Sequence, residues 1–180
     1  GKDDNSYTIK KLLDTEKIRN KLVVSKNNPT ITKSRINSSN KQILRLDDDN
    51  GYSYEKKILE IFKNNFQSFN AVLLSDYNKG TLIDIKKIIK ISNKYKIKTY
   101  IDPKSEDFSI YKGAYLLKPN KFEFDAACKK LNLHGNFNNK ARLLFSKLSL
   151  QNLFMKETYA SINTPEQIGL RQLLSEFRHC

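Results

Sequence analysis

Cysteine, histidine and long apolar runs are scarce in this chain of 180 residues. It has two cysteines, Cys128 and Cys180, and two histidines, His134 and His179. Two cysteines build no disulfide framework, which predicts a reducing, cytoplasmic environment. The histidines have no metal-ligand spacing with the cysteines, so no zinc site is expected. No apolar segment approaches the roughly 20 residues that span a bilayer, so we expect no membrane helix.

Arginine is also scarce, although the chain is strongly basic. The formal charge is +14, and only six of the 33 basic residues are arginine. A surface that binds nucleic acid combines arginine with aromatic platforms, whereas the lysines here are spread along the chain. Lysine, asparagine, isoleucine, tyrosine and phenylalanine are all encoded by A+T-rich codons. We therefore attribute most of the basic excess to the genome and disfavour a nucleic-acid-binding function.

Three widespread motifs are missing as well. The chain contains no G-x-x-x-x-G-K-[ST] loop, no G-x-G-x-x-G and no G-x-S-x-G. A P-loop nucleotide site, a Rossmann dinucleotide site and a hydrolase nucleophile elbow therefore have no motif support.

The spacing of apolar residues predicts an α/β domain. Helices are expected over residues 2–20, 53–66, 81–95, 121–131 and 138–149. Strands are expected over 30–36 and 41–47, joined as a β-hairpin, and over 71–74, 98–101, 114–117 and 153–155. Phe108 and Tyr111 fall in a short irregular segment between two strands. A hairpin followed by alternating strands and helices predicts a parallel sheet.

Three predicted strands each end abruptly in a polar cluster. The carboxyl ends of neighbouring parallel strands converge on one crevice, where open α/β sheets bind ligands. The side chains expected to meet there are Asp76, Lys79, Asp102, Lys104, Asn120 and Glu123. Each cluster alone is explained by a turn or by solvated charges, but their repetition favours a function. Lysine suits phosphate and carboxylates suit Mg²⁺, so a phosphorylated ligand with a divalent cation is predicted.

The unit Asn120-Lys121-Phe122-Glu123 opens a predicted helix and has two compatible interpretations. In one, Asn120 caps the helix and Glu123 returns the hydrogen bond. In the other, both side chains hold the Mg²⁺ and phosphates of a nucleotide through water, close to the positive end of the helix dipole.

The hairpin carries its own charged candidates, Lys33, Arg35, Arg45 and Asp47. They could reach a sugar or a phosphate if the hairpin covers the crevice. An exposed polar ribbon face is the commoner explanation of such a pattern.

Several phrases together resemble one enzyme family. They are Pro29–Arg35, Gln42–Asp47, Leu74–Gly80, Ile101–Lys104 with Asp107-Phe108, and Gly113-Ala114 through Leu117–Asn120. In order, over residues 1–155, they resemble the kinase half of the bacterial bifunctional heptose-7-phosphate kinase / heptose-1-phosphate adenylyltransferase family. That family belongs to the ribokinase-like, or PfkB, sugar kinases.

The resemblance implies a ribokinase-like α/β sandwich with a small β-hairpin lid at about residues 30–47 that also contributes to a homodimer. It implies that ATP with Mg²⁺ phosphorylates the anomeric hydroxyl of a heptose 7-phosphate, on the way to the ADP-heptose of lipopolysaccharide. Residues 120–123 match the family's N-x-x-E nucleotide motif, with Glu123 holding Mg²⁺ through water. Asp102 and Lys104 match its D-P-K, and Asp76 and Lys79 its S-D-Y-x-K-G.

The departures from the family pattern are as informative. The G-A-G-D signature, whose aspartate is the family's catalytic base and whose glycine amides form the anion hole, is absent from these 180 residues. So are the glycine-rich sugar-binding segment and the adenylyltransferase half. Lys118 stands where threonine is usual. We therefore expect a truncated kinase with little or no activity alone, no residue of the chain serving as catalytic base.

The last 24 residues, Glu157–Cys180, contain no lysine. A shifted reading frame, a fusion or slower drift would each account for this change in composition. The predicted organisation is a partial kinase domain over 1–155 and a divergent tail over 156–180.

Two other functions remain as alternatives. The chain could be a non-catalytic module that binds nucleotide or dimerises through the hairpin. Less favoured is a basic nucleic-acid-binding protein, whose affinity would fall steeply with salt.

Overall fold

The computed structural model describes residues 1–39, 41–48 and 57–155. The chain divides into two compact units. Unit 1 comprises Gly1–Ser68 and Asn78–Asp84, and unit 2 comprises Phe69–Tyr77 and the chain from Ile85 onward. The predicted tail at 156–180 lies outside the described residues.

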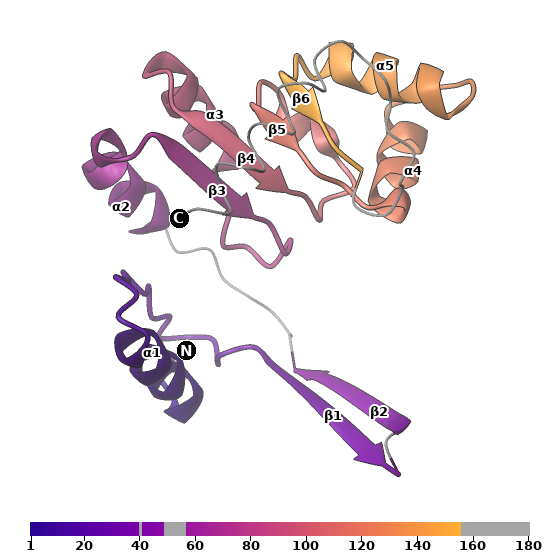
Figure 1. Ribbon diagram of the computed structural model, residues 1–180. Helices are drawn as coiled ribbons and strands as arrows, with labels where there is room; N and C mark the ends of the chain where they lie inside the picture. Colours follow the sequence, from indigo (N-terminus) through magenta and orange to yellow (C-terminus); the bar gives the residue numbers. More distant parts are fainter. Residues whose placement is uncertain (40, 49–56, 156–180) are drawn as a thin grey trace. The chain divides into compact units, whose positions relative to one another are not determined.

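Unit 2 is built on a parallel sheet of four strands in the order β3-β4-β5-β6 (Figure 1). The strands are β3 (Ala71–Ser75), β4 (Lys98–Asp102), β5 (Leu116–Leu117) and β6 (Asn152–Leu153). Ser75 pairs with Asp102, and Ile101 pairs with Leu117, so the strands end at nearly the same level. The parallel sheet, and with it the predicted α/β class, is confirmed. The register brings the loops that follow β3, β4 and β5 to one edge.

Helices α3 (Ile85–Lys94), α4 (Lys121–Lys130) and α5 (Phe137–Lys147) complete this unit with the 3-10 turn η2 (Phe108–Tyr111). In α3, Ile85, Ile88 and Ile89 are buried, because apolar residues recur at helical spacing on one face. Helix α3 begins four residues later than predicted. Asn78 and Gly80 both have positive φ, and Thr81–Asp84 forms turns instead of helix.

The core of unit 2 is apolar and closely packed. Its fully buried side chains include Phe108, Tyr111, Ile101, Leu117, Phe124 and Leu144. Complete burial of one such side chain stabilises a fold by about 1.5–3 kcal/mol. The irregular segment noted in the sequence is therefore not a loose connection, because both of its aromatic residues lie in this core.

Unit 1 begins with α1 (Asp4–Thr15), which is shorter than the predicted helix over 2–20. Asp3 caps its start by accepting a hydrogen bond from the Ser6 N–H. Lys17 adopts a left-handed φ of 54°, which ends the helix because the next residues cannot continue its hydrogen bonds. The Asp3 carboxylate also accepts from Thr30 N at 2.6 Å and from Thr30 Oγ1 at 2.7 Å. These bonds, led by that of the Thr30 backbone, lower the pKa of Asp3 to about 2.

The predicted hairpin is confirmed as β1 (Thr32–Ser38) and β2 (Lys41–Asp48), an antiparallel pair. The register shifts between Ile36 and Asn37, which marks a bulge. Every residue of both strands is exposed except Thr32, which is half-buried. Farther along, α2 (Lys57–Asn65) and the 3-10 turn η1 (Phe66–Ser68) form the predicted second helix. Its expected first residues, 53–56, lie outside the described residues.

In the part of the chain that the structure describes, no helix has the length and apolarity needed to cross a bilayer.

Candidate functional site at the strand ends of unit 2

The loops after β3, β4 and β5 are joined by backbone hydrogen bonds where they leave the sheet. Asp76 N donates to Asp102 O at 2.9 Å, and Lys118 N donates to Ile101 O at 2.9 Å. These bonds continue the sheet by one residue, so the polar clusters begin side by side. Asp76, Asp102 and Lys104 thus belong to one edge of unit 2, as the sequence predicts.

Asn120 and Glu123 form a complete capping box at the start of α4. Asn120 Oδ1 accepts from Glu123 N at 2.9 Å, and Glu123 Oε2 accepts from Asn120 N at 2.8 Å. The capping interpretation is confirmed. It occupies one oxygen of each side chain, which leaves the nucleotide interpretation open.

The second oxygen of Glu123 contacts the loop after β4. Lys104 Nζ lies 3.2 Å from Glu123 Oε1, and the exposed fractions of the two side chains are 55% and 10%. An ion pair with one exposed partner contributes little stability, on the order of 0–1 kcal/mol. The main effect of this ion pair is therefore on geometry, because it brings the D-P-K and N-x-x-E motifs together.

Tyr111 joins the loops after β3 and β4 through its hydroxyl group. Its hydroxyl donates to Asp76 Oδ2 at 2.5 Å and accepts from the backbone N–H groups of Lys104, at 3.3 Å, and Ser105, at 3.1 Å. Burial raises the pKa of Tyr111, and the bond to Asp76 raises it further. The hydroxyl is therefore a protonated donor at neutral pH. In the sequence, Tyr111 stands out only as part of an irregular segment, and the spacing Phe108-x-x-Tyr111 is its one local signal.

The other members of the N-x-x-E unit face elsewhere. Lys121 Nζ pairs with Asp125 Oδ2 at 2.7 Å, one turn farther along α4. Phe122 is 88% exposed. Lys118 is half-buried and places its ammonium over the ring of Phe154, 5.9 Å from the centroid.

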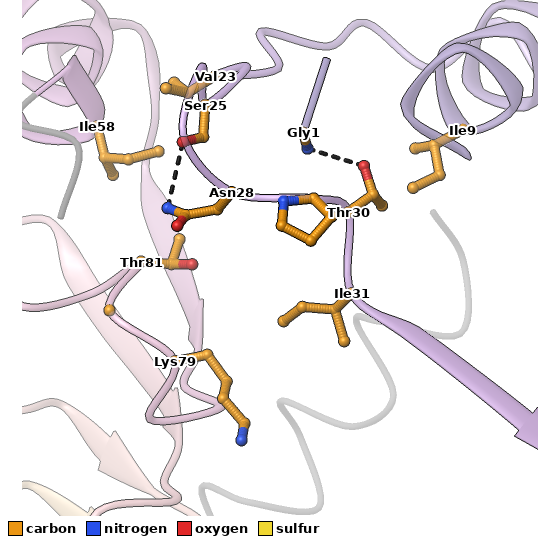
Figure 2. A pocket seen from close by; sticks show the side chains of 12 residues that line it. Gly1, Ile9, Val23, Ser25, Asn28, Thr30, Ile31, Ile58, Lys79 and Thr81 are labelled. Atoms are coloured by element: carbon orange, nitrogen blue, oxygen red, sulfur yellow. Dashed lines mark hydrogen bonds between the residues drawn. The ribbon is translucent and has the colours of Figure 1, made fainter. Parts of the chain in front are cut away.

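Lys79, expected at the same crevice, belongs to unit 1. There it lines a cavity of about 350 Å³ with Gly80 and Thr81. Figure 2 shows Asn28, Thr30 and Ile31 among the other lining residues, close to the start of the hairpin. Most of the lining is apolar, and Lys79 is its one charged side chain among the described residues.

The charged hairpin residues lie opposite each other across the two strands. Lys33 pairs with Asp47 and Arg35 with Arg45. Arg45 also binds Asp47 through two hydrogen bonds, of 2.7 and 2.6 Å, and the Arg45 guanidinium lowers the pKa of the Asp47 carboxyl. The four side chains therefore lie on one face of the hairpin, and two of them, Arg45 and Asp47, are held together by hydrogen bonds.

The donor set at the strand ends suits a hydrated divalent cation. Mg²⁺ keeps several waters and is usually held by one or two carboxylates together with phosphates. Glu123, Asp76 and Asp102 supply such carboxylates at this edge. Among the described residues, no three acidic, cysteine or histidine side chains gather closely enough to hold a metal by themselves.

Comparison with known proteins identifies the family. The family model described as pfkB family carbohydrate kinase matches residues 1–156. The bifunctional protein HldE of Haemophilus influenzae (strain PittEE) is 38% identical over 157 residues, covering 86% of this chain and 33% of that protein. HldE of Actinobacillus pleuropneumoniae serotype 5b is 41% identical over 128 residues, covering 70% and 27%, and HldE of Marinomonas sp. is 35% identical over 147, covering 80% and 31%. The chain thus spans about a third of the length of the curated relatives it matches. It belongs to the pfkB family of carbohydrate kinases.

Proposed function

We propose that this chain carries the nucleotide-binding part of an ATP-dependent sugar kinase whose substrate is a heptose 7-phosphate. The observation that carries the proposal is the contact between Lys104 and Glu123 at the start of α4. This contact places the Lys104 ammonium, which can bind phosphate, next to the Glu123 carboxylate and the N-terminus of α4. Phosphoryl transfer depends mainly on such positioning and charge neutralisation.

Each group has a distinct role in this proposal. Lys104 and the first N–H groups of α4 bind the nucleotide phosphates, because both present positive charge. Glu123, with Asn120, holds a water of the Mg²⁺ shell. When bound, Mg²⁺ neutralises charge on the phosphates. Asp76 and Asp102 are further candidates at the same edge, and the hairpin residues Lys33, Arg35, Arg45 and Asp47 are candidates for the sugar phosphate, as is Lys79.

Binding without turnover is the expected behaviour of this chain alone. Proton removal from the sugar hydroxyl and stabilisation of the transferring phosphoryl group need a base and an anion hole. The G-A-G-D segment that supplies both in the family is not among these 180 residues. ATP and sugar phosphates are metabolites of the cytoplasm, which is the proposed location.

Titration of the full chain with ADP, with and without Mg²⁺, tests the nucleotide proposal by calorimetry. We expect one site whose affinity requires Mg²⁺, and no ADP formation from ATP in the presence of heptose 7-phosphate. No heat at millimolar nucleotide would refute the proposed site. Rapid phosphorylation of the sugar would refute the expected inactivity.

We further propose that the hairpin joins two copies of the chain. Ile36, Leu44 and Leu46 are exposed, and cross-strand pairing puts Ile36 opposite Leu44 on the same face as Leu46. Such an apolar ribbon face is stable in water when a partner covers it.

Leu46→Glu should convert the dimer to a monomer, because it places a charge in the centre of the apolar face. The molar mass measured by light scattering after gel filtration should fall by half. Arg35→Glu is the matched control, since Arg35 lies in the regular part of the ladder and adjacent strand residues face opposite sides. Equal masses for both variants and the unaltered chain would contradict an interface on this face.

A further inference from the structure

The Tyr111 side chain hydrogen-bonds to the loops after both β3 and β4. Tyr111 is the last residue of the turn η2, and Asp107 caps that turn by accepting from Ser109 N at 3.0 Å. The ring is fully buried and packs edge-on against Phe108, with centroids 5.4 Å apart. Its hydroxyl therefore has little freedom to move.

The loop after β4 needs such an acceptor because of its sequence. Pro103 follows the last strand residue and has no N–H, so the first donors of the loop are Lys104 N and Ser105 N. Both point at the Tyr111 hydroxyl. The same hydroxyl donates its hydrogen bond to Asp76 Oδ2. One oxygen atom thus satisfies two backbone donors and one carboxylate from segments that are far apart in the sequence.

We propose that Tyr111 is a positioning residue, whose hydroxyl fixes the backbone at Lys104 and the carboxylate of Asp76 so that Lys104 stays beside Glu123. The inference rests on the proposed nucleotide site. Lys104 has a long and half-exposed side chain, so its ammonium can be placed reproducibly only if its backbone is held. Burial keeps the hydroxyl protonated, which preserves this arrangement of donor and acceptors at neutral pH.

Tyr111→Phe in the full chain tests the inference, because it removes one oxygen and keeps the ring. Amide hydrogen exchange measured by NMR should accelerate at Lys104 and Ser105 by about tenfold or more, since both N–H groups lose their acceptor. Tyr115→Phe is the matched control. The Tyr115 ring packs against Tyr100 in the neighbouring strand, and its hydroxyl makes no hydrogen bond among the described residues.

The affinity for Mg-ADP distinguishes a positioning role of Tyr111 from a purely structural one. Tyr111→Phe should raise the Kd by about fivefold in the unaltered chain, and by much less when Lys104 is already alanine, because the two residues act through one contact. An equal loss in both backgrounds would overturn the positioning role. So would unchanged exchange at both amides.

Two further results are decisive. If the unaltered chain does not bind Mg-ADP, the proposed function fails, and the exchange rates alone decide whether Tyr111 holds the loop. If Tyr111→Phe does not fold, the unaltered chain is measured instead, and the Lys104 and Ser105 amides should exchange at least about tenfold more slowly than unprotected amides. Exchange as fast as that of an unprotected amide would refute the inference.

Discussion

Glu123→Gln is expected to abolish most Mg²⁺-dependent binding of ADP while leaving α4 intact. Glutamine at the third helical position can still accept from the Asn120 N–H, so the capping box survives. The negative charge that attracts a hydrated cation is lost. Residues that hold a metal through its outer shell typically change its affinity by about 10–100-fold.

A thermal melt with and without Mg-ADP measures this effect directly. A ligand at 100 times its Kd stabilises the state that binds it by about 2.7 kcal/mol. The unaltered chain should show this stabilisation as a rise in melting temperature, and for Glu123→Gln at the same concentration the stabilisation should fall to about 0.4–1.4 kcal/mol. The matched control is Glu106→Gln, which removes the same charge from an exposed position in the loop after β4. Similar shifts for all three proteins would show that Glu123 is a capping residue only.

Phe124→Ala should be the most destabilising single change in α4. Phe124 is fully buried, and its ring lies 5.2 Å from that of Phe137 in α5. Truncating a buried phenylalanine to alanine costs about 3–5 kcal/mol, because transfer free energy is lost and a cavity remains. Whole domains have a free energy of unfolding of about 5–15 kcal/mol, so this one substitution would remove a large share of the stability of unit 2.

Urea denaturation followed by circular dichroism measures that loss. Phe122→Ala provides a stringent control, since it deletes the same ring two residues away in the same helix. With an exposed fraction of 88%, Phe122 should contribute less than about 0.5 kcal/mol. If the two variants lost equal stability, the burial of Phe124 and the packing of α4 on α5 would be wrong.

The local features of the fold were predictable from the sequence. The parallel sheet and the hairpin follow from apolar runs that alternate with polar turns, and the capping box follows from the spacing of Asn120 and Glu123. The predicted positions of the helix ends were less accurate. Left-handed residues such as Lys17 and Asn78 stop or delay a helix without any proline or glycine at that position to signal it.

The candidate site was predictable only in part, because sequence position is a weak guide to long-range contacts. The strand ends predicted that Asp76, Asp102 and Lys104 would share one edge of the sheet, but nothing local linked Tyr111 to Asp76, 35 residues away. The same reasoning grouped Lys79 with Asp76, although the boundary between the two units falls between these residues. The catalytic and binding roles of all these residues stay predictions.

The pairing of Lys104 with Glu123 means that the site is internally neutralised before a ligand arrives. When a phosphate binds Lys104, it replaces the Glu123 carboxylate as the partner of the ammonium group. The phosphate therefore does not bind an unpaired positive charge. The measured affinity would then report the difference between two ion pairs, which is smaller than either. We consequently expect nucleotide to bind this site weakly. Selectivity among anions would come from contacts other than the ion pair with Lys104.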